Sequence, residues 1–249
     1  MPPPDPAGKQ RQLSKPAVGA GVVVVLALLP FALKAAALAW FSSNYLAQSA
    51  YKVLQFIVPV GWRRRVDRAS GWRSIWPVDE PLPTAATWLV AVVLALLTIA
   101  LAAVLIPWVA GRSGIDPREL RRHFDARYAL NPWRAAAVVA YLATFNAGLE
   151  ELHFRAWLDR ELSARWGQLA GIGTSAAAFA GMHTFIFTGF GGPGSLILPA
   201  VFVALAVMGV TWSCLARLPG GIHAAWLAHG LTDAGFLTWG LFWLGYFSG

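Results

Sequence analysis

Two adjacent glutamates, Glu150 and Glu151, lie inside a mostly apolar stretch from Val139 to Trp157. An ionisable group at membrane depth is costly, so such groups usually face a protein interior or a wet cavity and usually have a function. Two later apolar segments carry His183 and His229, the second with an aspartate four residues further on. The pattern predicts a polar site built between helices.

The composition indicates a membrane protein. Of 249 residues, 57% are hydrophobic and 13% are charged, whereas a soluble domain carries roughly 25% charged residues. We therefore expect an all-α polytopic bundle of six or seven transmembrane helices. The net charge of +8 comes from Lys and Arg beside apolar runs, which suits lipid headgroups and not nucleic acid. The single cysteine, Cys214, excludes an intramolecular disulfide.

Hydropathy divides the chain into a tail, residues 1–16, expected to be disordered, an N-terminal set of membrane helices, 17–134, and a C-terminal membrane core, 135–249. Tyr45 to Trp62 is apolar but contains polar residues, so it is either a helix lying in the membrane interface or a further span. Gly189 to Gly194 is expected to form a flexible turn. The expected membrane helices are Ala17–Trp40, Thr87–Ala110, Ala135–Leu158, Leu169–Phe187, Leu196–Leu218 and Ile222–Phe247.

Helical spacing assigns different roles to the two glutamates. Glu151 and Arg155 are four residues apart, so they share a face and can form an ion pair. Glu150 lies on an adjacent face and is left free to exchange protons. His229 and Asp233 are also four residues apart, so both point in one direction.

Three motifs in the C-terminal half are similar to those of the CPBP family. This family comprises the CAAX prenyl protease type II and bacteriocin-processing intramembrane endopeptidases, also labelled abortive-infection proteins. The resemblance covers the chain from Ala135 to the end. The motifs are Glu150-Glu151-x-x-x-Arg155, Phe179-x-x-x-His183 and His229-x-x-x-Asp233.

The resemblance implies a glutamic intramembrane endopeptidase without a cofactor. Glu150 with His183 would activate a water molecule for attack on a peptide carbonyl. His229 and the residue at position 233 would stabilise the oxyanion. These implied roles agree with the chemistry of the residues, because a base with an orienting imidazole and nearby donors is what hydrolysis needs.

The remaining motif residues have supporting roles. Glu151 and Arg155 would form a supporting pair, and Phe179 is expected to contact the substrate. Position 233 is Asp here, where the CAAX-protease version of the motif has Asn. An ionised Asp233 cannot donate a hydrogen bond, so it is protonated, orients His229, or helps to bind a metal.

Two other kinds of protein stay open. His183, His229, Asp233 and a glutamate could bind one zinc ion, although the His-Glu-x-x-His signature of zinc proteases is absent. The same residues would suit a transporter, a proton relay or a non-enzymatic immunity protein. A transporter would more often show internal repeats, and none is visible in the sequence.

The sequence therefore predicts an endopeptidase that cuts a peptide bond at or within the bilayer. The expected substrate is a membrane-anchored or lipidated protein tail, or a leader peptide. The expected partners are this substrate and the lipid bilayer, and no nucleic acid. The abundance of Trp, Arg and Ala suggests a multi-pass protein of a bacterial inner membrane.

Overall fold

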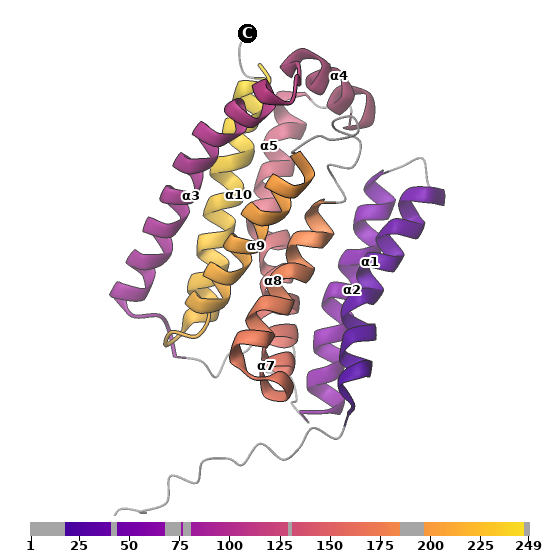
Figure 1. Ribbon diagram of the computed structural model, residues 1–249, viewed down its shortest axis with the longest axis vertical. Coiled ribbons are helices and arrows are strands. Elements are labelled where there is room, and N and C mark those ends of the chain that lie inside the picture. The colour runs from indigo at the N-terminus through magenta and orange to yellow at the C-terminus, as the bar shows by residue number, and fades with distance from the viewer. Residues whose placement is uncertain are drawn as a thin grey trace, which may run out of the picture.

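The computed structural model describes residues 18–40, 44–67, 76, 81–128, 131–184 and 197–246. These residues form helices and short connections without any strand, so the predicted all-helical fold is confirmed (Figure 1). The expected tail, 1–16, and the glycine-rich turn, 189–194, lie outside the described residues.

The helices form a bundle in which the elements run side by side (Figure 1). α1 and α2 form a hairpin at one side, α3 packs against α10 at the other, and α8 packs against α9 between them. The elements are α1 (Ala20–Trp40), α2 (Asn44–Arg65), α3 (Ala85–Arg112), α4 (Pro117–Tyr128), α5 (Pro132–Tyr141), the π-helical turn η2 (Leu142–Asn146), α6 (Ala147–His153), the π-helical turn η3 (Phe154–Asp159), α7 (Arg160–Trp166), α8 (Gln168–Thr184), α9 (Ile197–Leu215) and α10 (Gly221–Trp243).

α2 is a helix of the bundle. The sequence left Tyr45–Trp62 undecided between an interfacial helix and a span, because polar residues interrupt its apolar run. In the structure α2 packs against α1 and α6. Its polar Lys52 and Gln55 are buried, at 6% and 0% exposed, on the face that packs inward. The residues that blurred the hydropathy signal are therefore interior residues.

One continuous helical stretch runs through the centre of the bundle from Pro132 to Trp166. It begins at an Asn131 N-cap whose side chain accepts a hydrogen bond from the Arg134 amide at 2.9 Å, with proline at the first helical position. The predicted end at Leu158 is too early. The next residue, Asp159, is polar but buried, because it pairs with Arg217 at 2.6 Å.

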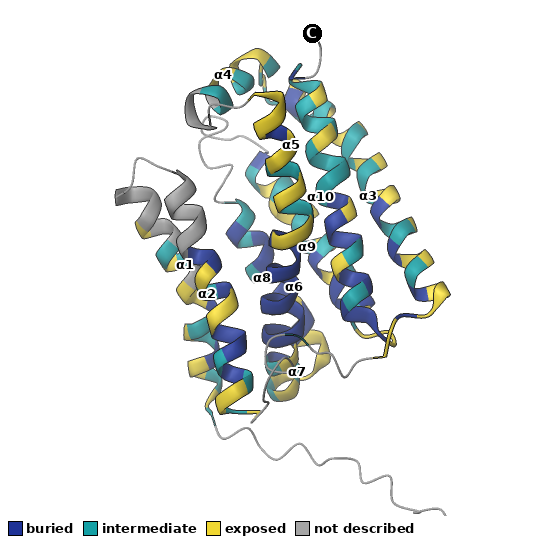
Figure 2. Ribbon diagram, turned by 180° about the vertical axis from the view of Figure 1, so that it is seen from behind, coloured by how far each residue is buried: buried dark blue, intermediate teal, exposed yellow. Residues whose placement is uncertain are grey.

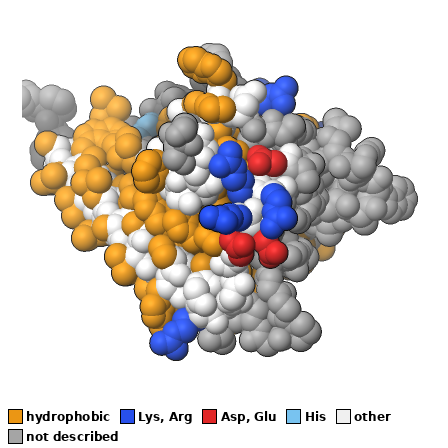
Figure 3. Space-filling view, turned by 90° about the horizontal axis from the view of Figure 1, so that it is seen from above, with side chains coloured by type: hydrophobic (Ala, Val, Ile, Leu, Met, Phe, Trp, Pro, Cys, Tyr) orange, Lys and Arg blue, Asp and Glu red, His pale blue; other side chains and the backbone are white. Residues whose placement is uncertain are grey.

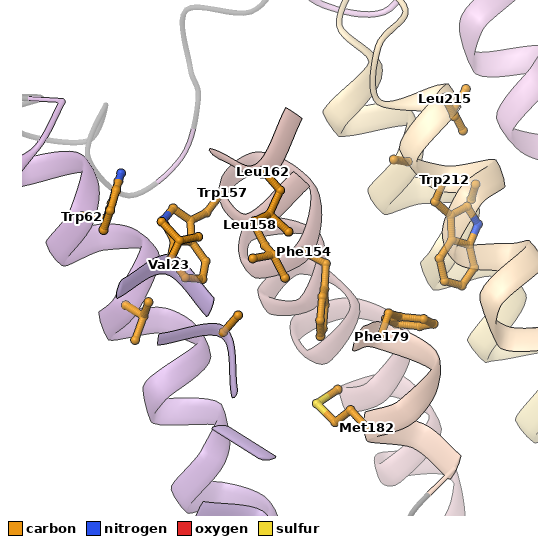
Figure 4. Packing of buried hydrophobic residues seen from close by; sticks show 14 of the residues in the cluster. Val23, Trp62, Phe154, Trp157, Leu158, Leu162, Phe179, Met182, Trp212 and Leu215 are labelled. Atoms are coloured by element: carbon orange, nitrogen blue, oxygen red, sulfur yellow. The ribbon is translucent and has the colours of Figure 1, made fainter. Parts of the chain in front are cut away.

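A cluster of aromatic and aliphatic side chains joins the hairpin to the central helices (Figure 4). Trp62 of α2 meets Trp157 of η3 edge to face, with ring centroids 6.0 Å apart. Phe154 meets Phe179 of α8 in the same way at 5.4 Å. Edge-to-face pairs add directional stabilisation to the burial of apolar area, so this cluster fixes how α2, η3 and α8 lie together.

Small residues let neighbouring backbones approach closely. A Cβ atom added at Gly209 of α9 would lie 3.0 Å from the Cα of Ala176 in α8. One added at Gly171 of α8 would lie 2.5 Å from the backbone nitrogen of Ser163 in α7. These contacts leave no room for a side chain at either glycine.

Two described helices are long and apolar enough to cross a bilayer, α3 with 28 residues and α9 with 19. α3 turns large apolar side chains outward, and Leu89 and Leu97 are 64% and 62% exposed. Figure 2 shows exposed positions along this helix. Such a surface suits hydrocarbon.

Charged side chains gather at the end of the molecule where α4 lies (Figure 3). This helix carries Arg118, Glu119, Arg121, Arg122 and Asp125.

The glycine contacts give a matched pair of substitutions in one helix. We expect Gly171→Ala to lower the free energy of unfolding by about 1–3 kcal/mol, the usual result of overpacking. Gly173 has nothing within 4 Å of an added Cβ, so Gly173→Ala should be neutral or slightly stabilising, because alanine favours helix. Thermal unfolding in detergent measures both, and equal effects of the two changes would contradict the packing described.

Candidate active site

Glu150 of α6 lies between two histidines from different helices. Its Oε2 atom is 3.5 Å from Nε2 of His183 in α8 and 3.6 Å from Nε2 of His229 in α10. The structure thus brings together ionisable groups from three segments that are far apart in the sequence. A small molecule bound beside Oε2 of Glu150 would therefore contact both imidazoles as well.

Glu151 forms a second buried group of contacts. Its Oε1 atom is 2.8 Å from Nδ1 of His229 and accepts a hydrogen bond from Arg155 at 3.0 Å. Arg155 also donates to the backbone carbonyl of Gly209 in α9 at 3.3 Å. The ion pair between Glu151 and Arg155 agrees with the helical spacing, and the chain from Arg155 through Glu151 orients the ring of His229.

Glu150 has a cation of its own, which corrects the prediction that it would be left free. Lys52 of α2 forms a buried salt bridge with Oε1 of Glu150. The same Oε1 accepts a hydrogen bond from Asn146 at 3.1 Å. Sequence reasoning missed both residues. The signal for Lys52 was present, because a lysine within an apolar segment is itself unusual at membrane depth.

Aromatic rings enclose the charged groups. The ring of Trp212 stacks on His229, with centroids 4.0 Å apart and planes 16° apart. The guanidinium of Arg155 lies 4.7 Å from the centroid of Phe179 and 5.2 Å from that of Trp212, within the range of cation–π attraction. Phe179 is 1% exposed and also packs on His183 at 4.4 Å. Its predicted contact with a substrate stays a prediction.

Two side chains of the site are partly exposed. Glu150 and Glu151 are 1% and 0% exposed, whereas the side chains of His183 and Asp233 are 20% and 24% exposed. Asp233 Oδ2 lies 3.6 Å from Nε2 of His229. A substrate and its water would therefore approach Glu150 past His183 and Asp233.

The contacts of His183 assign its proton. Nδ1 lies 2.9 Å from the carbonyl oxygen of Phe179, and a carbonyl can only accept, so Nδ1 carries the hydrogen. In the neutral ring Nε2 is then an acceptor. Both Nε2 of His183 and Oε2 of Glu150 therefore present lone pairs toward the same small volume.

His229 lies among acidic side chains. Three carboxyl groups surround it, those of Glu150, Glu151 and Asp233, each with an oxygen within 3.6 Å of a ring nitrogen. An imidazolium is stabilised by nearby acids. In that form Nε2 is a donor, and Nδ1 donates to Glu151.

Two π-helical turns flank the glutamates, η2 on one side and η3 on the other. In each, one backbone carbonyl accepts a hydrogen bond from a side chain of another helix. The carbonyl of Thr144 accepts from Trp226 at 2.9 Å, and that of Phe154 accepts from Ser175 at 2.9 Å. Single π-helical turns inside helices are frequent at functional sites, and here they tie the central stretch to α10 and α8.

The residues of the predicted zinc alternative make other contacts in the structure, and zinc binding stays a prediction. Among the residues that the structure describes, no group of three or more His, Cys, Asp and Glu side chains is arranged to hold a metal ion. Nδ1 of His229 is engaged with Glu151, and Lys52 places a positive charge on Glu150. An ammonium beside the carboxylate would repel a metal cation.

Residues 132–235 match the family model of the Rce1-like type II CAAX prenyl endopeptidases. The chain therefore carries a domain of this family, which confirms the resemblance seen in its motifs. The match indicates a protease of the CAAX type that is embedded in a membrane. Comparisons with curated proteins and with solved structures return no significant match.

The double contact of Arg155 gives a stability test. We expect Arg155→Lys to lower the free energy of unfolding by about 1–3 kcal/mol. Arg155 reaches Glu151 and the Gly209 carbonyl with two different nitrogens, whereas the donors of an ammonium share one nitrogen, so one of these buried acceptors loses its partner. Arg118→Lys, at an exposed position of α4, is the matched control. Thermal unfolding in detergent compares the two, and an unchanged Arg155→Lys protein would refute the contact.

Proposed function

We propose that the protein is a glutamic intramembrane endopeptidase in which Glu150 is the general base. The observation that carries the proposal is the position of Oε2 of Glu150, 3.5 Å from His183 and 3.6 Å from His229 in a buried site. A carboxylate with two imidazoles around the same point can take a proton, orient a nucleophile and stabilise charge.

The first step follows from the two acceptors. A water molecule beside Oε2 of Glu150 and Nε2 of His183 would donate one hydrogen to each. Its oxygen attacks the peptide carbonyl carbon, the new C–O bond forms, and the proton moves to Glu150. In the second step the C–N bond breaks and Glu150 returns that proton to the leaving amine, so that the site is restored.

His229 suits the oxyanion. As an imidazolium it would donate from Nε2 toward the carbonyl oxygen as negative charge develops. Glu151 and Arg155 hold the ring from the other side. Asp233, which faces Nε2, adds negative charge that favours the protonated ring, and we assign it this supporting role.

The substrate that we propose is a membrane-anchored or lipidated protein tail, or a leader peptide. The surroundings support this choice, because the partly exposed residues of the site, His183 and Asp233, belong to apolar helices of the bundle. A peptide bond that reaches them would lie at the depth of the hydrocarbon. The family description, a CAAX prenyl endopeptidase, supports a C-terminal tail.

Cleavage by the purified protein tests this function. Wild type in detergent or proteoliposomes should cut a tagged, membrane-anchored tail peptide, prenylated or unprenylated. Glu150→Gln and His183→Ala should each lower kcat/KM by about 10²–10⁴-fold, which is the usual contribution of general acid–base catalysis to the rate. Glu119→Gln, on the 73% exposed side chain of α4, should be neutral.

Three outcomes would contradict the proposal. A wild-type protein that cuts no tail would favour a non-enzymatic role. Full activity of Glu150→Gln would remove Glu150 as the base. Loss of activity with a chelator, restored by zinc, would replace the metal-free mechanism by the zinc alternative.

We also propose that the protein crosses a bacterial inner membrane six or seven times. α1, α2, α8 and α10 have 17 to 23 residues and run alongside α3 and α9 (Figure 1), so a bilayer that holds the latter would enclose the former. The stretch 132–166 would be one more span. The total is seven spans if α2 crosses the membrane and six if it lies in the membrane interface. On this proposal 135–249 is the catalytic core and 17–134 supports it.

Labelling of single cysteines tests the topology. Trp133 and Trp166 lie at opposite ends of the central stretch and are 86% and 45% exposed, about 50 Å apart at 1.5 Å per residue. In a Cys214→Ala background we expect Trp133→Cys and Trp166→Cys to react with an impermeant maleimide from opposite sides of inverted and right-side-out vesicles. Reaction of both from one side would refute a span.

A further inference from the structure

Lys52 reaches the site from outside the matched domain. It belongs to α2, and its ammonium pairs with Glu150, 98 residues further along the chain. The matched family region begins only at residue 132. Nothing in the three motifs includes this lysine, so its role has to be derived from its surroundings.

A lysine is an unfavourable choice for simple packing at this position. Its side chain is 8% exposed, and taking an ammonium out of water is expensive even when it is paired. An apolar residue would fill the same space between α2 and α6 at lower cost if Glu150 were also apolar. The lysine is therefore tied to the charge on Glu150.

The contacts of Glu150 divide between its two oxygens. Oε1 receives Lys52 and Asn146, and both are donors. Oε2 faces Nε2 of His183 and Nε2 of His229. Because the two donors occupy one side of the carboxylate, they fix its plane and leave the other oxygen directed toward the two imidazoles.

We propose that Lys52 is a positioning residue for the general base: with Asn146 it holds Oε1 of Glu150 so that Oε2 faces the attacking water. This inference rests on the proposed function. The ammonium also offsets the negative charges of Glu151 and Asp233 near the carboxylate. His183 and His229 face Glu150 itself, and Arg155 pairs with the neighbouring Glu151.

Enzyme kinetics of Lys52→Met test the role. We expect kcat to fall by about 10- to 100-fold, the scale of a displaced catalytic group, with a smaller change in KM. The acidic limb of the pH–rate profile should move to higher pH, because the positive charge that favours ionised Glu150 is gone. Lys52→Arg, which keeps the charge, should restore part of kcat and return the acidic limb toward wild type.

Gln55→Met is the matched control on the same helix. Gln55 is fully buried and donates to the sulfur of Met182 at 3.4 Å, so it shares the burial of Lys52 and not its contact with Glu150. Its pH–rate profile should coincide with that of wild type. Wild-type kinetics for Lys52→Met, or an equal shift for Gln55→Met, would overturn the inference while leaving the proposed function intact.

A double-mutant cycle on thermal unfolding tests the pairing without a substrate. Lys52→Met should lower the unfolding temperature, and Lys52→Met combined with Glu150→Gln should recover part of the loss, because no uncompensated charge is then buried. Additive effects would show that the two residues do not pair and would overturn the inference. Coupled effects in a protein that cuts nothing would reject the proposed function and, with it, the catalytic role of Lys52.

Discussion

Two carboxylates side by side in an apolar interior can stay ionised only if each has a positive partner, and this requirement organises the centre of the molecule. Arg155 serves Glu151 from one turn along the same stretch, and Lys52 serves Glu150 from α2. The desolvation of four charged groups has to be offset by short contacts. α2, α6, α8 and α10 therefore meet where those contacts form.

Much of this centre could be predicted from the sequence, because charge at membrane depth is rare and has to be accounted for. Glu150 and His183 were identified by that argument, and the pairing of Glu151 with Arg155 follows from a spacing of four. The family match confirms the resemblance to the family. These predictions succeeded where the signal is local, either a residue type in a hydropathy segment or a pair on one helix.

The failures have the opposite character. Lys52 contacts Glu150 through packing between helices, which no periodic pattern shows. Asn146 precedes Glu150 by four residues, so its contact agrees with helical spacing, but a neutral amide gives no signal of its own in an apolar segment. Polar residues also hid α2 as a possible span. The hydropathy average over α2 falls because its buried face carries Lys52 and Gln55, so a segment that lines the site looks less like a membrane helix. Length and composition identify α3 and α9, which contribute less to the site.

The position of Lys52 bears on how far the catalytic unit is modular. Sequence comparison draws its boundary at residues 132–235, but the counter-charge of Glu150 arrives from the α1–α2 hairpin. A chimera that inherited the matched region alone would receive a buried acid without its cation. Recombination between relatives would therefore have to transfer the α1–α2 hairpin together with the matched region. The set of residues that balance one another's charge is larger than the region matched by the family model.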